Sequence, residues 1–292
     1  MALDQKRLQK PFKKLRRTLK KFPRNAGADK VHKLRTNSRG VESVIAARTE
    51  DPCRRERRLL KLIAAVRKRA GKVRDMDVLT SFADNLPMLE GEEECKTLLL
   101  EDLGAMRKDD TRKLFRKVRS TGGRLRRKLR RSKSRLTRSL QPETEASAAG
   151  RRAASEALDI AAQLAEIERL DRRNLHEYRL MVKHLRNVLQ FADESQAHEE
   201  LIEDLKETKD AIGEWHDWEM LAAIAAEVTG EHPRCKLMSR IRQIVREHYK
   251  SAQKSAIELQ ERHFKPAVRG RKADRGPAIN REAVSAAASL VA

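Results

Sequence analysis

The chain has 292 residues, 39% of them hydrophobic, which is enough to bury a core in one or two domains. It carries 66 Lys+Arg against 43 Asp+Glu, a formal net charge of +23, and only 3% of its residues are aromatic. No apolar run approaches ~18–20 residues and the N-terminus lacks the apolar segment of a secretion signal, so we expect a cytoplasmic protein without a membrane span. A balance this basic favours polyanionic partners.

The positive charge is concentrated in the first half of the chain. Residues 1–140 hold 42 Lys+Arg and 17 Asp+Glu, a net +25, whereas residues 141–292 carry a net −2. The densest segment, 112–138, has 14 basic residues and no acidic one. An apolar stripe still runs through this segment at helical spacing, which predicts a helix docked on a core. The stripe consists of Leu114, Val118, Leu125, Leu129, Leu136 and Leu140.

Helical periodicity covers nearly the whole chain, and the alternation typical of strands is absent. The pattern predicts helices near 3–22, 28–49, 52–70, 73–86, 93–119 and 123–139, then near 148–168, 171–192, 195–212, 214–229 and 234–263. Gly122-Gly123 is expected to kink or break the basic helix. Residues 141–150 are expected to link the two halves, and residues 266–292 to form a loose basic tail with a short helix near 280–290.

The three cysteines, Cys53, Cys95 and Cys235, are odd in number and far apart. They match no zinc spacing and predict no disulfide framework, which fits a reducing compartment.

The two halves echo each other. The segment VHKLRTNSR (31–39) aligns with LHEYRLMVK (175–183) at an offset of 144 residues. A second pair, GKVRDMDVL (71–79) and GEWHDWEML (213–221), follows at an offset of 142. Two motifs in the same order at nearly the same offset indicate a duplicated helical unit with a pseudo-twofold relation.

Each copy of the first motif has a cationic face. His32, Arg35 and Arg39 follow one another at spacings of three and four residues, so one side of a helix carries all three. The second copy carries His176, Arg179, Lys183 and Arg186 in the same way. Planar guanidinium groups in such a row suit phosphate oxygens, which accept paired hydrogen bonds. Two such rows facing each other would form a cationic groove for a polyanion.

These four segments resemble the conserved histidine α-helical domain, the CHAD family, over about residues 5–263. The resemblance implies an all-α fold of two pseudo-symmetric four-helix bundles around a basic cavity or groove, with one CHAD domain over 1–265 and halves at about 1–140 and 148–265. It also implies binding of inorganic polyphosphate and association with polyphosphate granules in bacteria. It assigns His32, Arg35, Arg39, His176, Arg179, Lys183 and Arg186 to the basic face, and Arg74 to the Gly-x-x-Arg-Asp motif.

The chain departs from the family pattern in two places. Gly40 and Glu42 stand where more arginine is usual, and His216 replaces the residue before the second Asp. We therefore expect the first-half face to depend also on basic residues of the long helix, a prediction made from charge alone. These are Arg112, Lys113 and Arg116.

Other functions fit the sequence less well. Non-specific nucleic-acid binding is the alternative that the charge allows, although no aromatic platforms or DNA-binding motif support it. Phosphoryl-transfer enzymes need metal-binding carboxylates or a phosphate-binding glycine loop, and no Walker A motif is present. We predict no catalytic residues, metal ligands or cofactor, and no membrane partner. Trp215 and Trp218 are expected in the core, and the role of His216 is left open.

Overall fold

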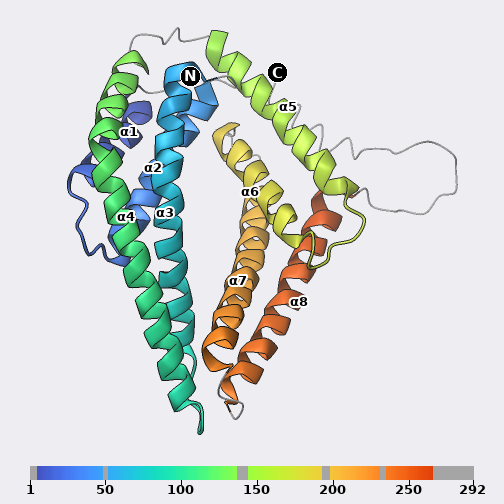
Figure 1. Ribbon diagram of the computed structural model, residues 1–292. Helices are drawn as coiled ribbons and strands as arrows, with labels where there is room; N and C mark the ends of the chain where they lie inside the picture. Colours follow the sequence, from blue (N-terminus) through green and yellow to red (C-terminus); the bar gives the residue numbers. More distant parts are fainter. Residues whose placement is uncertain (1–4, 49–51, 137–143, 193–197, 231–234, 266–292) are drawn as a thin grey trace, which may run out of the picture. The chain divides into compact units, whose positions relative to one another are not determined.

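The computed structural model describes residues 5–48, 52–136, 144–192, 198–230 and 235–265. These residues form eight helices and no strand, which confirms the all-α prediction (Figure 1). None of the described helices is long and apolar enough to cross a membrane. The helices are α1 (Gln5–Lys20), α2 (Ala28–Arg48), α3 (Arg54–Asn85), α4 (Glu93–Leu136), α5 (Thr144–Glu166), α6 (Leu175–Ala192), α7 (Glu199–Thr229) and α8 (Leu237–His263).

The chain divides into two compact units. The first comprises residues 1–146 and 224–237, and the second comprises residues 147–223 and 238–292. Helices α1 to α4 belong to the first unit, and α5, α6 and most of α7 and α8 belong to the second. The first-motif copies lie on α2 and α6, and the second-motif copies lie on α3 and α7.

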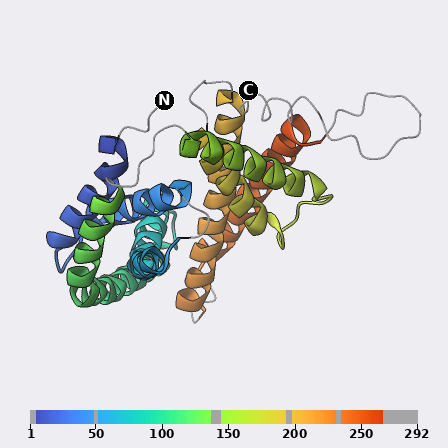
Figure 2. The same cartoon turned by 90° about the horizontal axis from the view of Figure 1, so that it is seen from above.

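Helices α1 to α4 pack as a ring, in which each contacts the next and α4 returns to α1 (Figures 1 and 2). Sequence dictates the buried sides, because apolar residues recur every three or four positions along each helix. The stripe predicted on the basic helix is confirmed for its described members, since Leu114, Val118, Leu125 and Leu129 are at most 5% exposed. The shared core also contains Phe12, Leu15, Leu34, Val41, Ile45, Leu59, Ile63 and Val66.

Three helices are continuous where the sequence predicted breaks. Gly71 lies inside α3, Gly122-Gly123 inside α4, and Gly213 inside α7. A glycine in a helix interior costs only about 1 kcal/mol. Continuing the helix keeps apolar residues on both sides of the glycine in the core, as Ala70 and Val73 are in α3, and this burial outweighs that cost.

The predicted linker is shorter than expected, because α5 begins at Thr144. Alanine-rich sequence after that residue favours helix over loop. The predicted tail and its helix near 280–290 lie outside the described residues.

The expectation of no disulfide is wrong, since Cys95 and Cys235 are paired with a Cα–Cα distance of 6.4 Å. The bond joins the start of α4 to the segment before α8, across 140 residues of sequence. Beside it, the buried Lys96 ammonium donates to the carbonyl oxygens of Asp84 and Leu86 at 2.9 and 2.6 Å, and so caps the C-terminal end of α3. Cys53 is exposed and unpaired.

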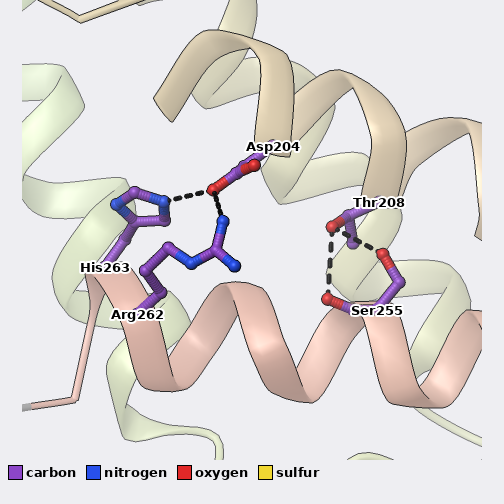
Figure 3. Close-up of polar contacts among 5 residues, drawn as sticks. All are labelled: Asp204, Thr208, Ser255, Arg262 and His263. Atoms are coloured by element: carbon purple, nitrogen blue, oxygen red, sulfur yellow. Dashed lines mark hydrogen bonds and ion pairs between the residues drawn. The ribbon is translucent and has the colours of Figure 1, made fainter. Parts of the chain in front are cut away.

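In the second unit, α8 makes polar contacts with each of the other three helices. The buried Tyr178 hydroxyl on α6 donates to the Ala256 carbonyl at 3.2 Å. The Gln260 amide donates to the carbonyl of Leu164 at the end of α5, at 2.8 Å. Helix α7 is joined to α8 by two clusters drawn in Figure 3. They are Thr208 with Ser255, and Asp204 with Arg262 and His263.

Candidate anion-binding faces on α2 and α6

The first predicted face lies on α2. Burial of Val31 and Leu34 turns the opposite side of the helix outward, and His32 and Arg39 are exposed there. The His32 imidazole lies 3.4 Å from the Thr36 hydroxyl. These side chains are therefore accessible to an anion from solvent.

Arg35 lies at the edge of this face, next to α3. Its guanidinium is 3.6 Å from the Asp75 carboxylate, and the two side chains are 22% and 45% exposed. Asp75 therefore forms an ion pair within the fold. The neighbouring Arg74 is half-buried on α3. An anion arriving at Arg35 thus competes with a carboxylate that already contacts it.

The departure at Glu42 is compensated by a residue that the sequence prediction missed. The Arg67 guanidinium lies 2.9 Å from the Glu42 carboxylate, which neutralises that charge on the α2–α3 side. Arg67 precedes Arg74 by seven residues, so two helical turns place both on one side of α3. This seven-residue spacing is the feature of the sequence from which Arg67 could have been predicted.

The second predicted face lies on α6. Tyr178, Val182 and Leu185 are buried, and His176 is exposed on the other side of the helix. Arg179 is half-buried, and its Nε donates to the Lys209 carbonyl on α7 at 3.2 Å. This partner orients the guanidinium without neutralising it. Further along α6, Lys183 and Arg186 are also half-buried.

Gly213 leaves the space that Arg179 occupies. A Cβ atom at this position would lie 2.7 Å from one terminal guanidinium nitrogen and 3.2 Å from Nε. In the first copy of the motif, a Cβ at Gly71 would meet no atom within 4 Å. The two glycines occupy the same position of the repeat, but only Gly213, in the second unit, makes room for an arginine side chain.

His216 on α7 joins the second face. Its ring lies 5.1 Å from the His176 ring, centroid to centroid, and the planes are inclined by 53°. Burial, His216 and Arg179 lower the pKa of His176, and Glu177 opposes the shift. A bound anion would favour the protonated form of this imidazole. The alignment of His216 with Arg74 in the repeat was the sequence signal for this position.

The basic residues predicted on the long helix are not brought next to α2. Arg112, Lys113 and Arg116 are exposed on α4, which packs on α3 and α1 and lies diagonal to α2 in the ring. The Lys113 ammonium pairs with Asp109 at 2.5 Å. This hydrogen bond and the nearby Arg112 and Arg116 charges lower the pKa of Asp109 against a smaller opposing effect of burial.

Trp215 and Trp218 are 2% and 8% exposed, which confirms the prediction that they belong to the core. Within the described part of the chain, no group of three or more His, Cys, Asp and Glu side chains has an arrangement that could hold a metal ion. The candidate residues of the two faces carry imidazole, guanidinium and ammonium groups, and the Thr36 hydroxyl and the Asp75 carboxylate lie beside those of the first face.

The fold and these faces define an all-helical domain that carries a His/Arg motif twice, each time on a helix packed against the helix of the second motif. The chain belongs to the CHAD domain family, whose model matches residues 5–226. Among solved structures, the crystal structure of the CHAD domain from the plant Ricinus communis is similar, with a TM-score of 0.57. The match has 16% sequence identity and covers 96% of this chain and 97% of that one. No curated protein matches the chain.

Proposed function

We propose that the chain binds inorganic polyphosphate without reacting with it, at the His/Arg faces of α2 and α6. The observation that carries the proposal is the position of Arg179. Its guanidinium donates to a backbone carbonyl and occupies the space left by Gly213, beside the His176–His216 pair. A group fixed in this way suits an anion that binds at a defined place.

Polyphosphate fits the composition of the faces better than a nucleic acid does. It offers a dense row of anionic oxygens, which guanidinium and ammonium groups bind, and it has no bases to stack. The tryptophans of the second unit are buried, so they offer no stacking platform to a single-stranded nucleic acid.

The family resemblance extends this proposal. It predicts that the two units form pseudo-symmetric four-helix bundles and that both faces line one basic cavity. It also predicts that the protein is found on polyphosphate granules in the cytoplasm.

A competition titration tests the choice of polyanion. Labelled long-chain polyphosphate is bound at about 0.15 M salt and then challenged with duplex DNA, RNA and orthophosphate at matched phosphate concentration. We expect polyphosphate to remain bound against a large excess of each competitor. Displacement by nucleic acid at parity would reject a dedicated polyphosphate site.

A double substitution tests the place of binding. Arg179→Ala with Lys183→Ala removes two charges from the α6 face, and Arg269→Ala with Arg271→Ala removes two charges from the C-terminal segment. We expect the first pair to weaken polyphosphate binding more than the second. Equal losses would mean that the protein attracts polyphosphate through its overall charge, without a site.

A further inference from the structure

The side of the first unit formed by α1 and α4 is strongly basic. In the ring of four helices, this side lies opposite the one formed by α2 and α3, where Arg35 contacts Asp75 and Arg67 contacts Glu42. Helix α1 contains no acidic residue, and neither does α4 from Arg112 to its end. The two sides therefore differ, because arginines on one side form ion pairs with carboxylates, whereas the segments that form the other contain basic residues and no acidic one.

A row of cations follows the edge of α4 that faces α1. Lys133 lies on this edge, since, besides burial, the nearby charges of Lys13 and Arg16 on α1 contribute to lowering its pKa. Arg130, Arg126 and Arg119 precede Lys133 by 3, 7 and 14 residues, so helical spacing puts them on the same side. The row is about 21 Å long at 1.5 Å per residue. Arg119 and Arg130 are exposed, and Arg126 is half-buried.

A second row runs along α1. Lys10, Lys13, Arg16 and Lys20 recur at spacings of three and four residues, and all four are exposed. Burial lowers the pKa of Lys133, and the positive charges of Lys13 and Arg16 lower it further. Like charges are thus close enough across the α1–α4 seam to disfavour one another, and an anion bound there would relieve this repulsion.

We propose that the α1–α4 side is a second polyanion-binding surface, which binds the phosphate backbone of double-stranded DNA without reading its sequence. The surface is independent of the polyphosphate site proposed on α2 and α6. Its two cationic rows lie on neighbouring helices, whose axes are typically about 8–10 Å apart. Two rows on helices that pack against each other can contact the phosphates of two strands across the narrow minor groove of B-DNA, which is about 6 Å wide.

Other nucleic acids and polyphosphate fit the surface less well. The minor groove of an RNA duplex is wide and shallow, so its strands lie too far apart for the two rows. A single strand of nucleic acid needs several aromatic platforms, and this side offers few, because Phe12 on α1 is buried in the core and Phe115 on α4 is half-buried. Polyphosphate has a single strand of phosphates, so two rows along neighbouring helices match the two-stranded backbone of a duplex better.

The experiment measures binding of a labelled random-sequence DNA duplex by fluorescence anisotropy between about 0.05 and 0.3 M salt. Lys13→Gln with Arg16→Gln changes the α1 row, and Arg126→Gln with Arg130→Gln changes the α4 row independently. Arg39→Gln with Arg74→Gln removes the same charge from the opposite side of the unit. Long-chain polyphosphate and an RNA duplex are measured in parallel with every variant.

Removing two phosphate contacts should reduce the slope of log affinity against log salt by about 1.8. We expect this reduction for both α1–α4 variants with DNA, while their polyphosphate affinity stays within about twofold of the unmodified protein. The Arg39/Arg74 variant should keep the DNA slope. Unchanged DNA slopes in the α1–α4 variants, or equal reductions in all three, would overturn the proposal.

Two further results would also overturn it. If the α1–α4 variants lose polyphosphate binding as strongly as DNA binding, the surface belongs to polyphosphate. If the RNA duplex binds more tightly than DNA with the same slopes, the two-row geometry is wrong. If instead polyphosphate binding is insensitive to Arg179→Ala with Lys183→Ala, the polyphosphate site is refuted and the DNA surface is unaffected.

Discussion

The substitution Gly213→Ala tests whether the missing side chain at Gly213 is what allows Arg179 to keep its position in the second unit. The added Cβ would lie 2.7 Å from a terminal nitrogen of Arg179, whereas ordinary van der Waals contact begins at 3.4 Å. The guanidinium must therefore move by about 0.7 Å. The Nε of the same side chain is already 3.2 Å from the Lys209 carbonyl, so this movement strains or breaks that hydrogen bond.

The expected effects on stability and on binding differ. Replacing glycine by alanine in a helix interior stabilises the helix by up to about 1 kcal/mol. A hydrogen bond from a charged group contributes about 1.5–3 kcal/mol, and less of it is lost where solvent can replace the partner. Because these terms oppose each other and Arg179 is half-buried, we expect the unfolding free energy to change by less than ~1 kcal/mol.

Polyphosphate affinity should fall at least about fivefold, since a displaced guanidinium loses ~1 kcal/mol or more of a charged contact. The assay is a titration with long-chain polyphosphate at about 0.15 M salt, together with a urea unfolding curve. The matched control is Gly71→Ala, where the new Cβ meets no atom within 4 Å. We expect this control to gain stability and to keep its affinity. If both variants bind equally well, Arg179 does not depend on Gly213 and the reasoning is wrong.

Three other predictions follow from particular contacts. Cys95→Ser should lower the unfolding free energy by about 2–4 kcal/mol without reductant, while Cys53→Ser, at the exposed N-cap of α3 where serine is a preferred residue, should not lower the urea midpoint. Burial has the largest single effect on the pKa of Asp204 and raises it, but the hydrogen bonds and charges of His263 and Arg262 together lower the pKa below its ordinary value. The stability this provides is complete above the ordinary carboxyl value of 3.8 and is lost as the pH falls through the lowered value, so Asp204→Asn should flatten the acid limb of a stability curve. Since the pKa of His176 is lowered in the free protein, an anion that raises it must bind with proton uptake, and polyphosphate affinity should rise from pH 8 to pH 5.5. His176→Gln should reduce this rise and His184→Gln should not; equal behaviour of the two variants would contradict the assignment.

The sequence predicted the helical class and the buried side of most helices, because one apolar residue every three or four positions leaves few other solutions. The basic helix is the clearest case, since Leu114 and Val118 are buried despite the surrounding charge. Helix ends at glycine were predicted wrongly. Gly71 and Gly213 weaken their helices locally, but the sequence pattern does not state how much burial the continuous helix gains.

The candidate site was predicted in part for a related reason. Spacing along one helix identified His176 and Arg179, since these positions share a face. It did not identify the neighbours that decide their chemistry. Gly213 and the Lys209 carbonyl approach Arg179 from α7, and the separation in sequence gives no measure of that approach. The Cys95–Cys235 bond was missed for the same reason, because its partners are 140 residues apart.

The two copies of the motif have diverged into different electrostatic arrangements. In the first, Arg35 contacts the Asp75 carboxylate at 3.6 Å, and an incoming phosphate must displace this anion. In the second, Arg179 is oriented by a neutral carbonyl and keeps its full charge for a ligand. The first half of the chain carries the net charge of +25 that attracts a polyanion over distance, and salt screens that attraction. The second copy, in a half with a net charge of −2, has the better-prepared short-range contact, which salt screens less. Under the proposed function we therefore expect the first half to contribute most of the salt-dependent attraction of polyphosphate and the α6 face to contribute the contact that salt affects less.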